Sequence, residues 1–448
     1  MKRTSTAIIH FGLALAIGIY GPTLTPASAN SSNLPTKLSP SDAAIEKRFG
    51  ASVGISGTTI IVGAPKDRVD GSDAGAAYFF EQQPSGAWQQ TIKHASTTPV
   101  TADRLGYSVD LTGNTAIVGS QNRYAKVYER NLGGFNTWGE SATLTPPGLT
   151  GNNWFGWAVG ISDDTAIVGS GDSSTAYVFG RNTGGQNHWG QMAILTGVGS
   201  SVGDRFGFTA AVSNNTAIVG AMYDQAPGPE SGAAYIFDRN LGGIDKWGEA
   251  IRLQPSDVEA YDRFGQGVAI AGDTAVVGAW WDNGNGAKSG SAYVFDRNAG
   301  GPNHWGQVAK LLAQDVTSEF GFSVDISGDT VVIGAPYDDD RGAQAGAAYF
   351  FGRNYGGTNS WGQFAKVLPT DFYATEFGGA VAISGDIAVI GVVYDREHGN
   401  QSGAAYVLAV PECSSLISAA IGIIGFVVPW GERRRRSIET TSDVLDAI

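Results

Sequence analysis

Residues 320–336 read Phe-Gly-Phe-Ser-Val-Asp-Ile-Ser-Gly-Asp-Thr-Val-Val-Ile-Gly-Ala-Pro. Near the start of this stretch, apolar Val324 and Ile326 alternate with polar Ser323 and Asp325, which is the two-residue period of a half-buried β-strand. Residues 327–330 are of the types that form tight turns, and the apolar run that follows them is typical of a buried strand. The stretch therefore predicts a β-hairpin whose second strand lies in the core.

This pattern recurs along most of the chain with a period of 50 to 58 residues. Hairpin turns are expected at Gly113-Asn114, Asp163-Asp164, Asn214-Asn215, Gly272-Asp273 and Gly385-Asp386, whose residue types tolerate positive φ. Each repeat then carries a strand such as residues 347–351, and five of the repeats continue with a strand that begins with Trp-Gly. Each repeat starts from an anchor, an apolar residue followed by Gly: Phe49, Leu105, Phe155, Phe206, Phe264, Phe320 and Phe377. Four strands per repeat and seven repeats predict an all-β, seven-bladed β-propeller.

The two ends of the repeat region indicate a closed ring rather than an open solenoid, which would need special caps. The last repeat stops after its third strand, at residues 403–410, and lacks a Trp-Gly strand. Residues 36–42 (Thr-Lys-Leu-Ser-Pro-Ser-Asp) align with residues 251–257 (Ile-Arg-Leu-Gln-Pro-Ser-Asp), which belong to a fourth strand. We therefore expect the N-terminal strand to complete the seventh blade. Cys413 is the single cysteine, so no intramolecular disulfide closes the ring.

The composition supports this fold and argues against one class of partner. The chain has 64 Gly residues together with 10% aromatic residues, a mixture that suits many short strands joined by tight turns and that collagen-like or disordered chains lack. The formal net charge is −13. Because an acidic protein repels phosphate backbones, we expect no nucleic-acid partner.

The N-terminus has the layout of a secretory signal peptide. Lys2 and Arg3 precede a mainly apolar stretch at residues 7–20, and Ala27-Ser28-Ala29 gives the small-x-small pattern that signal peptidase accepts. We expect residues 1–29 to be removed after Ala29. A retained membrane anchor is the alternative.

The C-terminal residues 411–448 have three parts. Pro411-Glu412 is followed by an apolar run of 15 residues, 416–430, and then by Arg433, Arg434, Arg435 and Arg436. This layout resembles the PEP-CTERM sorting signal of Gram-negative bacteria, although Cys413 replaces the second Pro and residues 437–448 extend beyond the arginines. The apolar run is short for a permanent span, which needs about 20 residues, and the arginines favour the cytoplasmic side. The resemblance implies an exosortase-type partner, a transient or terminal membrane contact, and a location in the envelope, at the surface or in the matrix. A plain C-terminal membrane tail is the alternative.

The repeat itself resembles a known family. Phe-Gly is followed about fourteen residues later by Gly-Ala-Pro, as at residues 63–65 and 334–336, and this resembles the FG-GAP repeat of integrin α subunits and many bacterial surface proteins. The resemblance covers residues 34–410 and implies a propeller domain at 30–410. The family often carries a calcium loop in the first hairpin. Here that hairpin is too short to supply the several oxygens that Ca²⁺ needs, so we expect no cofactor.

Another acidic loop recurs after the second strand of five repeats. One interpretation is a ring of weak cation sites, richest at Asp338, Asp339 and Asp340 and at Asp67, Asp70 and Asp73. We favour the other, in which each Asp hydrogen-bonds its own loop and a Gly four residues later adopts positive φ, so that no metal is expected. The loops begin at Asp67, Asp224, Asp282, Asp338 and Asp395, and the glycines are Gly71, Gly228, Gly286, Gly342 and Gly399.

The sequence offers no catalytic constellation. His188 and His304 occupy the same place in two repeats, which indicates an architectural role, and we find no nucleophile motif, metal-ligand spacing or nucleotide-binding loop. We therefore expect a protein that is not an enzyme.

Three tryptophans depart from the repeat and are the candidate ligand-binding residues. Trp280 and Trp281 replace Ala-Pro-Tyr-like residues, and Trp154 replaces the Arg or Glu that precedes other anchors. By the family resemblance, these positions share one face of the ring, where exposed Trp can bind a glycan or a protein. Local packing is the alternative. The sequence thus predicts an envelope or matrix adhesion module, with a display scaffold or a polysaccharide-active enzyme as alternatives.

Overall fold

The computed structural model describes residues 35–69, 72–96, 103–121, 123–146, 148, 153–315, 319–371 and 374–410. The predicted signal peptide, with Ala27 and Ala29, and the predicted sorting segment, with Pro411, Glu412 and the four arginines, lie outside these residues. The same holds for Asp70 and Gly71.

The described residues form seven four-stranded antiparallel sheets, which are the blades. In blades 1 to 6 the strands follow chain order from the first to the fourth. Blades 1 to 3 consist of β2 Ser52–Ser56, β3 Thr59–Ala64, β6 Ala76–Gln82 and β7 Trp88–Ala95; β8 Ser108–Thr112, β9 Thr115–Gly119, β10 Ala125–Arg130 and β11 Trp138–Leu144; and β12 Phe155–Ser162, β13 Thr165–Ser170, β14 Thr175–Gly180 and β15 Gly190–Leu195. Blades 4 and 5 consist of β16 Thr209–Ser213, β17 Thr216–Ala221, β18 Ala233–Arg239 and β19 Trp247–Leu253; and β20 Phe264–Ala271, β21 Thr274–Ala279, β22 Ser291–Asp296 and β23 Gly306–Leu311.

Blade 6 consists of β24 Ser323–Ser327, β25 Thr330–Ala335, β26 Ala347–Gly352 and β27 Gly362–Val367. Blade 7 combines β28 Phe377–Ser384, β29 Ile387–Val392 and β30 Ala404–Ala409 with the N-terminal β1 Thr36–Leu38. A two-stranded ribbon, β4 Arg68–Val69 and β5 Ser72–Asp73, lies in the acidic loop of blade 1.

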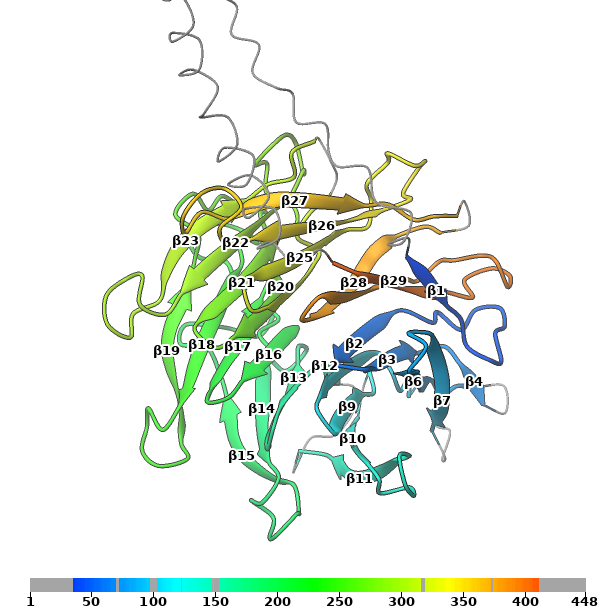
Figure 1. Cartoon of the computed structure of the whole chain (residues 1–448). Coiled ribbons are helices and arrows are strands. Elements are labelled where there is room, and N and C mark those ends of the chain that lie inside the picture. The colour runs from blue at the N-terminus through cyan, green and yellow to red at the C-terminus, as the bar shows by residue number, and fades with distance from the viewer. Residues whose placement is uncertain are drawn as a thin grey trace, which may run out of the picture. The chain divides into compact units, whose positions relative to one another are not determined.

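The first strands of the blades close a ring. Each contacts the first strand of the next blade, from β2 through β8, β12, β16, β20 and β24 to β28, which contacts β2 again. The N-terminal β1 pairs with β30, with Thr36 opposite Val407. Figure 1 shows this closure, with the blue β1 beside the orange strands of the last repeat. The predicted seven-bladed propeller and its closure by the N-terminal strand are confirmed.

The anchors explain how neighbouring blades come together. Phe320 is fully buried and packs edge-to-face against Tyr349 and Phe351, with ring centres 5.3 and 5.8 Å apart. The following Gly321 has φ +92°, and a Cβ there would lie 2.2 Å from the carbonyl oxygen of Ser291 in the preceding blade. Only Gly permits so close an approach at this φ. The first residues of the predicted hairpin turns also adopt positive φ, as expected.

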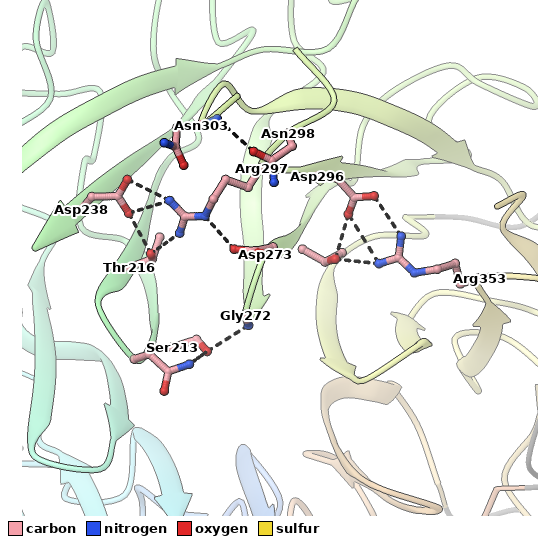
Figure 2. A network of polar contacts seen from close by, with 12 residues as sticks. Ser213, Thr216, Asp238, Gly272, Asp273, Asp296, Arg297, Asn298, Asn303 and Arg353 are labelled. Atoms are coloured by element: carbon pink, nitrogen blue, oxygen red, sulfur yellow. Dashed lines mark hydrogen bonds and ion pairs between the residues drawn. The ribbon is translucent and has the colours of Figure 1, made fainter. Parts of the chain in front are cut away.

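Arginine clasps tie most blades to the one before, each formed by an Arg at the end of the third strand and an acid of the preceding blade. Figure 2 shows Arg297 of blade 5 donating to both oxygens of Asp238 in blade 4, at 2.9 and 3.1 Å, and to Asp273 at 2.7 Å. The guanidinium also lies over Trp305, 5.0 Å from the ring centre. Such multiply bonded ion pairs are stronger than single ones. Equivalent clasps join Arg130 to Glu81, Arg181 to Glu129 and Arg353 to Asp296.

Candidate functional site

Two sets of loops share one face of the propeller. In blades 1, 2, 4 and 5 the loop after the second strand donates a backbone hydrogen bond to the segment that leads into the anchor of the same blade. In blade 4 the Tyr223 N–H donates to the Asp204 carbonyl at 3.2 Å, and in blade 5 the Trp281 N–H donates to the Asp262 carbonyl at 3.3 Å. The candidate tryptophans therefore belong to loops that meet.

The residue before each anchor has the left-handed backbone conformation in all seven blades. The φ values run from 50° to 61°, a region that costs a non-Gly residue about 1–2 kcal/mol. All seven side chains are half-buried. The residues are Arg48, Arg104, Trp154, Arg205, Arg263, Glu319 and Glu376.

Five residues form a continuous surface over blades 3, 4 and 5, which we call the aromatic–arginine belt: Trp154, Arg205, Tyr223, Arg263 and Trp281. The Arg205 guanidinium lies 4.7 Å from the ring centre of Trp154 and 4.9 Å from that of Tyr223. Arg263 lies 5.1 Å from Tyr223 and 3.4 Å from Trp281. The belt thus links Trp154 to Trp281, and Trp280 packs beside Trp281 at 5.3 Å.

Further aromatic side chains extend the belt. Trp157 stacks on Trp154 with ring centres 4.5 Å apart and also contacts Tyr107 and Phe208. Phe322 packs against Trp280. The sequence analysis did not single out Tyr107, Phe208 or Phe322. Like Trp157, each directly follows an anchor Gly, and that shared position was the signal that could have identified them.

The charged groups of the belt differ in how they are paired. Arg263 donates to Glu230 at 2.7 and 2.9 Å. Arg205, in contrast, makes neither a hydrogen bond nor an ion pair with its side chain in the part of the chain that the structure describes. Its guanidinium is held between two aromatic faces, and its N–H groups are available to a ligand.

Burial raises the pKa of the two carboxyls at the equivalent positions of blades 6 and 7. Burial raises the pKa of Glu319 to about 7, although Lys288 and Arg263 act in the opposite direction. Burial also raises the pKa of Glu376. Below pH 7 this face therefore carries less negative charge than its sequence suggests.

The acidic loops bind a cation of the chain itself. Asp338 is buried and accepts hydrogen bonds from the Tyr349 hydroxyl at 2.7 Å and from the Lys366 ammonium at 3.0 Å. Lys366 also donates to Asp315 at 2.5 Å and to Asp340 at 2.6 Å. These three carboxylates are the group with metal-ligand spacing among the described residues, and the ammonium lies among them.

The ionisation of this cluster follows from its pairing. Burial alone would lower the pKa of Lys366, but the hydrogen bonds to Asp315 and Asp340 outweigh it and raise the pKa. For Asp338, burial is outweighed by the bonds from Tyr349 and its own loop, and the pKa falls. Both groups are therefore charged at neutral pH.

The predicted hydrogen bond between the Asp and its own loop is present in three of the acidic loops. Asp224, Asp338 and Asp395 each accept the N–H two residues later in their own loop. Gly286, Gly342 and Gly399 have positive φ as expected, whereas Gly228 does not, so the prediction is wrong there. Among the other weak metal candidates, Asp67 pairs with Lys93, Asp73 with Arg68, and Asp339 accepts the Gln344 N–H.

Two half-buried carboxyls link first strands at the centre of the ring. Asp110 in β8 accepts the Ile161 N–H of the next blade at 2.7 Å, and Asp325 in β24 accepts the Ile383 N–H at 2.7 Å. Burial raises the pKa of Asp110 to about 6 and that of Asp325 to about 7. Their contacts indicate a structural role between blades.

With this geometry established, comparison with known proteins identifies the family. A family model described as "FG-GAP repeat" matches residues 34–80, 138–179, 189–237, 247–295, 305–351 and 361–408, more than half of the chain. The chain belongs to the FG-GAP repeat family.

The FG-GAP segments are offset from the blades by one strand. Residues 247–295, for example, start with β19, the outer strand of blade 4, and continue through the first three strands of blade 5. The repeat anchored at Leu105 is not among the matched segments, yet it folds as blade 2 with the same strand order.

One solved structure similar to this FG-GAP propeller is that of the computationally designed Ika8 protein. It is 14% identical in sequence, with a TM-score of 0.48, and the match covers 84% of this chain and 99% of that one. No curated protein matches the chain. Within the described ranges, no helix is long and apolar enough to cross a membrane.

Proposed function

We propose that this FG-GAP propeller is an exported binding module of the bacterial cell envelope or matrix, and that its aromatic–arginine belt binds an acidic glycan. The observation that carries the proposal is Arg205, a guanidinium held between Trp154 and Tyr223 without an ion-pair partner among the described residues.

The chemistry of the belt fits such a ligand. Flat indole and phenol rings pack against the apolar faces of sugar rings, and a guanidinium binds a carboxylate or sulfate through two parallel hydrogen bonds. Because Arg205 is already oriented by its aromatic neighbours, little side-chain entropy is lost when a ligand binds. Arg205 and Arg263 also place two guanidinium groups in the belt of a chain whose formal net charge is −13.

The terminal segments support export. The N-terminal pattern ending at Ala27-Ser28-Ala29 fits a signal peptide, and Pro411-Glu412 with the arginine cluster fits processing by exosortase-type machinery. An exported protein of this kind would be in contact with extracellular polysaccharide.

A display scaffold is the second candidate. The arginine clasps and lysine-filled acidic loops favour a rigid ring that needs neither metal nor disulfide to stay folded. A protein partner could use the same belt, since Trp, Tyr and Arg dominate protein interfaces. The experiment below distinguishes these candidates.

The test applies the full chain to arrays of acidic and neutral bacterial exopolysaccharides and of envelope proteins, with and without a chelator. Wild type is compared with the double variant Trp280→Ala/Trp281→Ala, with Arg205→Gln, and with Phe135→Ala, which removes a 96% exposed aromatic side chain outside the belt. We expect binding to acidic glycans that both belt variants lose and Phe135→Ala keeps.

Other outcomes would point elsewhere. Binding to envelope proteins alone would replace the glycan with a protein partner. If a chelator abolished binding and the belt variants did not, the acidic loops would be the better candidates, as ion sites. A folded protein that binds nothing on the arrays would leave the display scaffold as the better account.

A further inference from the structure

The interface between blades 3 and 4 lacks the arginine clasp. Its arginine, Arg239, is present at the end of β18, but both acids that such an arginine contacts are replaced. Gly180 occupies the place that Asp238 and Asp296 fill in the next two blades, and Asn215 occupies the hairpin position of Asp273.

Arg239 pairs instead within its own loop. Its guanidinium donates to Asp245 at 2.6 and 2.9 Å. Asp245 is 56% exposed, and the equivalent residue is Asn in the loops of the other blades that carry a clasp arginine. Exposed ion pairs contribute little to stability, so an incoming anion can exchange with Asp245 at small cost.

Two polar side chains close to this interface have groups that lack a hydrogen-bond partner among the described residues. Thr165 is 2% exposed, and its hydroxyl makes no hydrogen bond in the described part of the chain. The equivalent hydroxyls of Thr115 and Thr274 accept hydrogen bonds from clasp arginines at 2.7 and 2.6 Å. The side-chain oxygen of Gln191 is also buried without a hydrogen-bond partner. A buried polar atom without a partner destabilises the protein unless a ligand or water satisfies it.

The structure leaves a hollow beside Arg239 and Gln191. A hollow of about 510 Å³ is lined by Gly180, Arg239, Gln191, Met192 and Thr183, among others. A Cβ at residue 180 would lie 2.6 Å from the Met192 sulfur and from the Thr183 hydroxyl, so these two flexible side chains occupy that position and must shift when an acid takes it. The hollow at the next interface has similar walls but already contains the carboxylate of Asp238.

We propose that the interface between blades 3 and 4 binds a small hydroxy-carboxylate of the sugar-acid class, whose carboxylate takes the place that Asp238 and Asp296 fill elsewhere. The carboxylate accepts from Arg239 and Thr165, and a ligand hydroxyl donates to Gln191. Clasp arginines follow the third strand, whereas the belt follows the second strand of antiparallel blades. This site therefore lies on the opposite face from the belt, and it does not depend on the function proposed for the belt.

The test titrates the full chain, labelled with ¹⁵N at the tryptophan indoles, with acetate, glucuronate and neutral glucose at constant ionic strength. The reporter is the Trp247 indole N–H, because the equivalent Trp138 indole donates to the clasp acid Glu81 at 3.3 Å. Trp247→Phe assigns its signal. We expect a saturable shift with both carboxylates, none with glucose, and tighter binding of glucuronate because acetate has no hydroxyl for Gln191.

Three variants make the test specific. Gly180→Asp places a carboxylate of the protein itself next to Arg239. The shift of the Trp247 indole signal on addition of a carboxylate is therefore expected to disappear. Asp245→Asn frees Arg239, so carboxylates are expected to bind about two- to fivefold more tightly. Asp238→Gly removes a clasp acid from the next interface and is expected to make the Trp305 indole signal respond to acetate.

Each outcome of these titrations supports or overturns a specific part of the proposal. Equal affinity for acetate and glucuronate would keep the carboxylate site but overturn the sugar-acid class. No saturable shift in wild type or in Asp245→Asn would overturn the proposal, whether or not Asp238→Gly responds. A shift that persists in a folded Gly180→Asp protein would overturn it as well.

Discussion

At the scale of single residues, the seven positions before the anchors share one backbone conformation but not one side chain. All seven have positive φ, which the fold imposes, while their identities are Arg, Trp or Glu. Because the backbone has the same conformation in every blade, the fold does not determine the side chain at this position, and the side chain can differ according to the ligand. At this position Trp154 of blade 3 departs from the repeat, whereas Arg205 and Arg263 of blades 4 and 5 are of its commonest residue type.

Arg205→Gln should weaken binding of an acidic glycan about tenfold or more and leave neutral glycans unaffected, because a charge-assisted bidentate contact is lost. Isothermal titration calorimetry with matched acidic and neutral oligosaccharides measures this. Arg104→Gln is the control, since Arg104 holds the same position in blade 2 but bonds to Gln121. Equal losses in both variants would contradict a specific role for Arg205.

Affinity for an acidic glycan should fall as pH rises from about 6 to 8. Burial raises the pKa of Glu319 to about 7, so its carboxyl is neutral below that pH and negatively charged above it, next to Lys288 and Arg263 and with Glu376 also near. Binding measured across this range should flatten in Glu319→Gln. An unchanged profile in that variant would assign the dependence to another group.

The sequence predicted part of the belt for an identifiable reason. Trp154, Trp280 and Trp281 break the repeat, so comparison of the repeats revealed them. Arg205 and Tyr223 obey the repeat, and their importance lies in a contact between neighbouring blades. Such a contact depends on how the blades pack, which repeat spacing does not specify.

At the scale of elements, each blade is a hairpin pair stabilised by polar groups from its own loops and strands. The sequence predicted the strands and turns correctly because alternation and turn residues are local signals. The partners of the acidic loops were missed because Tyr349 and Lys366 lie 11 and 28 residues beyond Asp338, on two different strands. Only the register of the sheet brings them together.

Tyr349→Phe should lower the free energy of unfolding by about 1–3 kcal/mol, because it removes a hydrogen bond to a buried carboxylate. Tyr177→Phe should be nearly neutral, since the Tyr177 hydroxyl in blade 3, which lacks the acidic loop, makes no hydrogen bond within the described ranges. Urea denaturation of both variants measures the difference. A cost as large for Tyr177 as for Tyr349 would show that ring packing, not the acidic loop, sets the effect.

At the scale of the whole molecule, the ring depends on a closure made by three residues of β1. Lys37 pairs with Asp371, Asp395 and Glu397 of the last repeat at 2.7 to 2.9 Å. The same ammonium position in blade 6 is filled by Lys366, from a strand adjacent in sequence. The same lysine–aspartate contact thus joins strands that are close in sequence in blade 6 and the two ends of the repeat region in blade 7.

Lys37→Met should lower the free energy of unfolding by about 3 kcal/mol, because Asp395 is fully buried and would lose its cation. Lys310→Met, which removes the equivalent cation of blade 5, should cost a similar amount. Only Lys37→Met should speed hydrogen exchange across β28, β29 and β30, because only it loosens the closure. Unchanged exchange in those strands would show that β1 is held by its backbone pairing alone.

The offset between the FG-GAP segments and the blades has a consequence for how such proteins evolve. A duplication of one matched segment would copy a stretch that starts with one blade's outer strand and ends with the next blade's third strand. The first strand of the new copy would become the fourth strand of the preceding blade. The blade formed by its other three strands would take its fourth strand from the segment that follows. After such an insertion every blade still has four strands, so no third strand is left as a new sheet edge that could promote aggregation. The ring can therefore gain or lose a repeat in one genetic event while its two ends still meet.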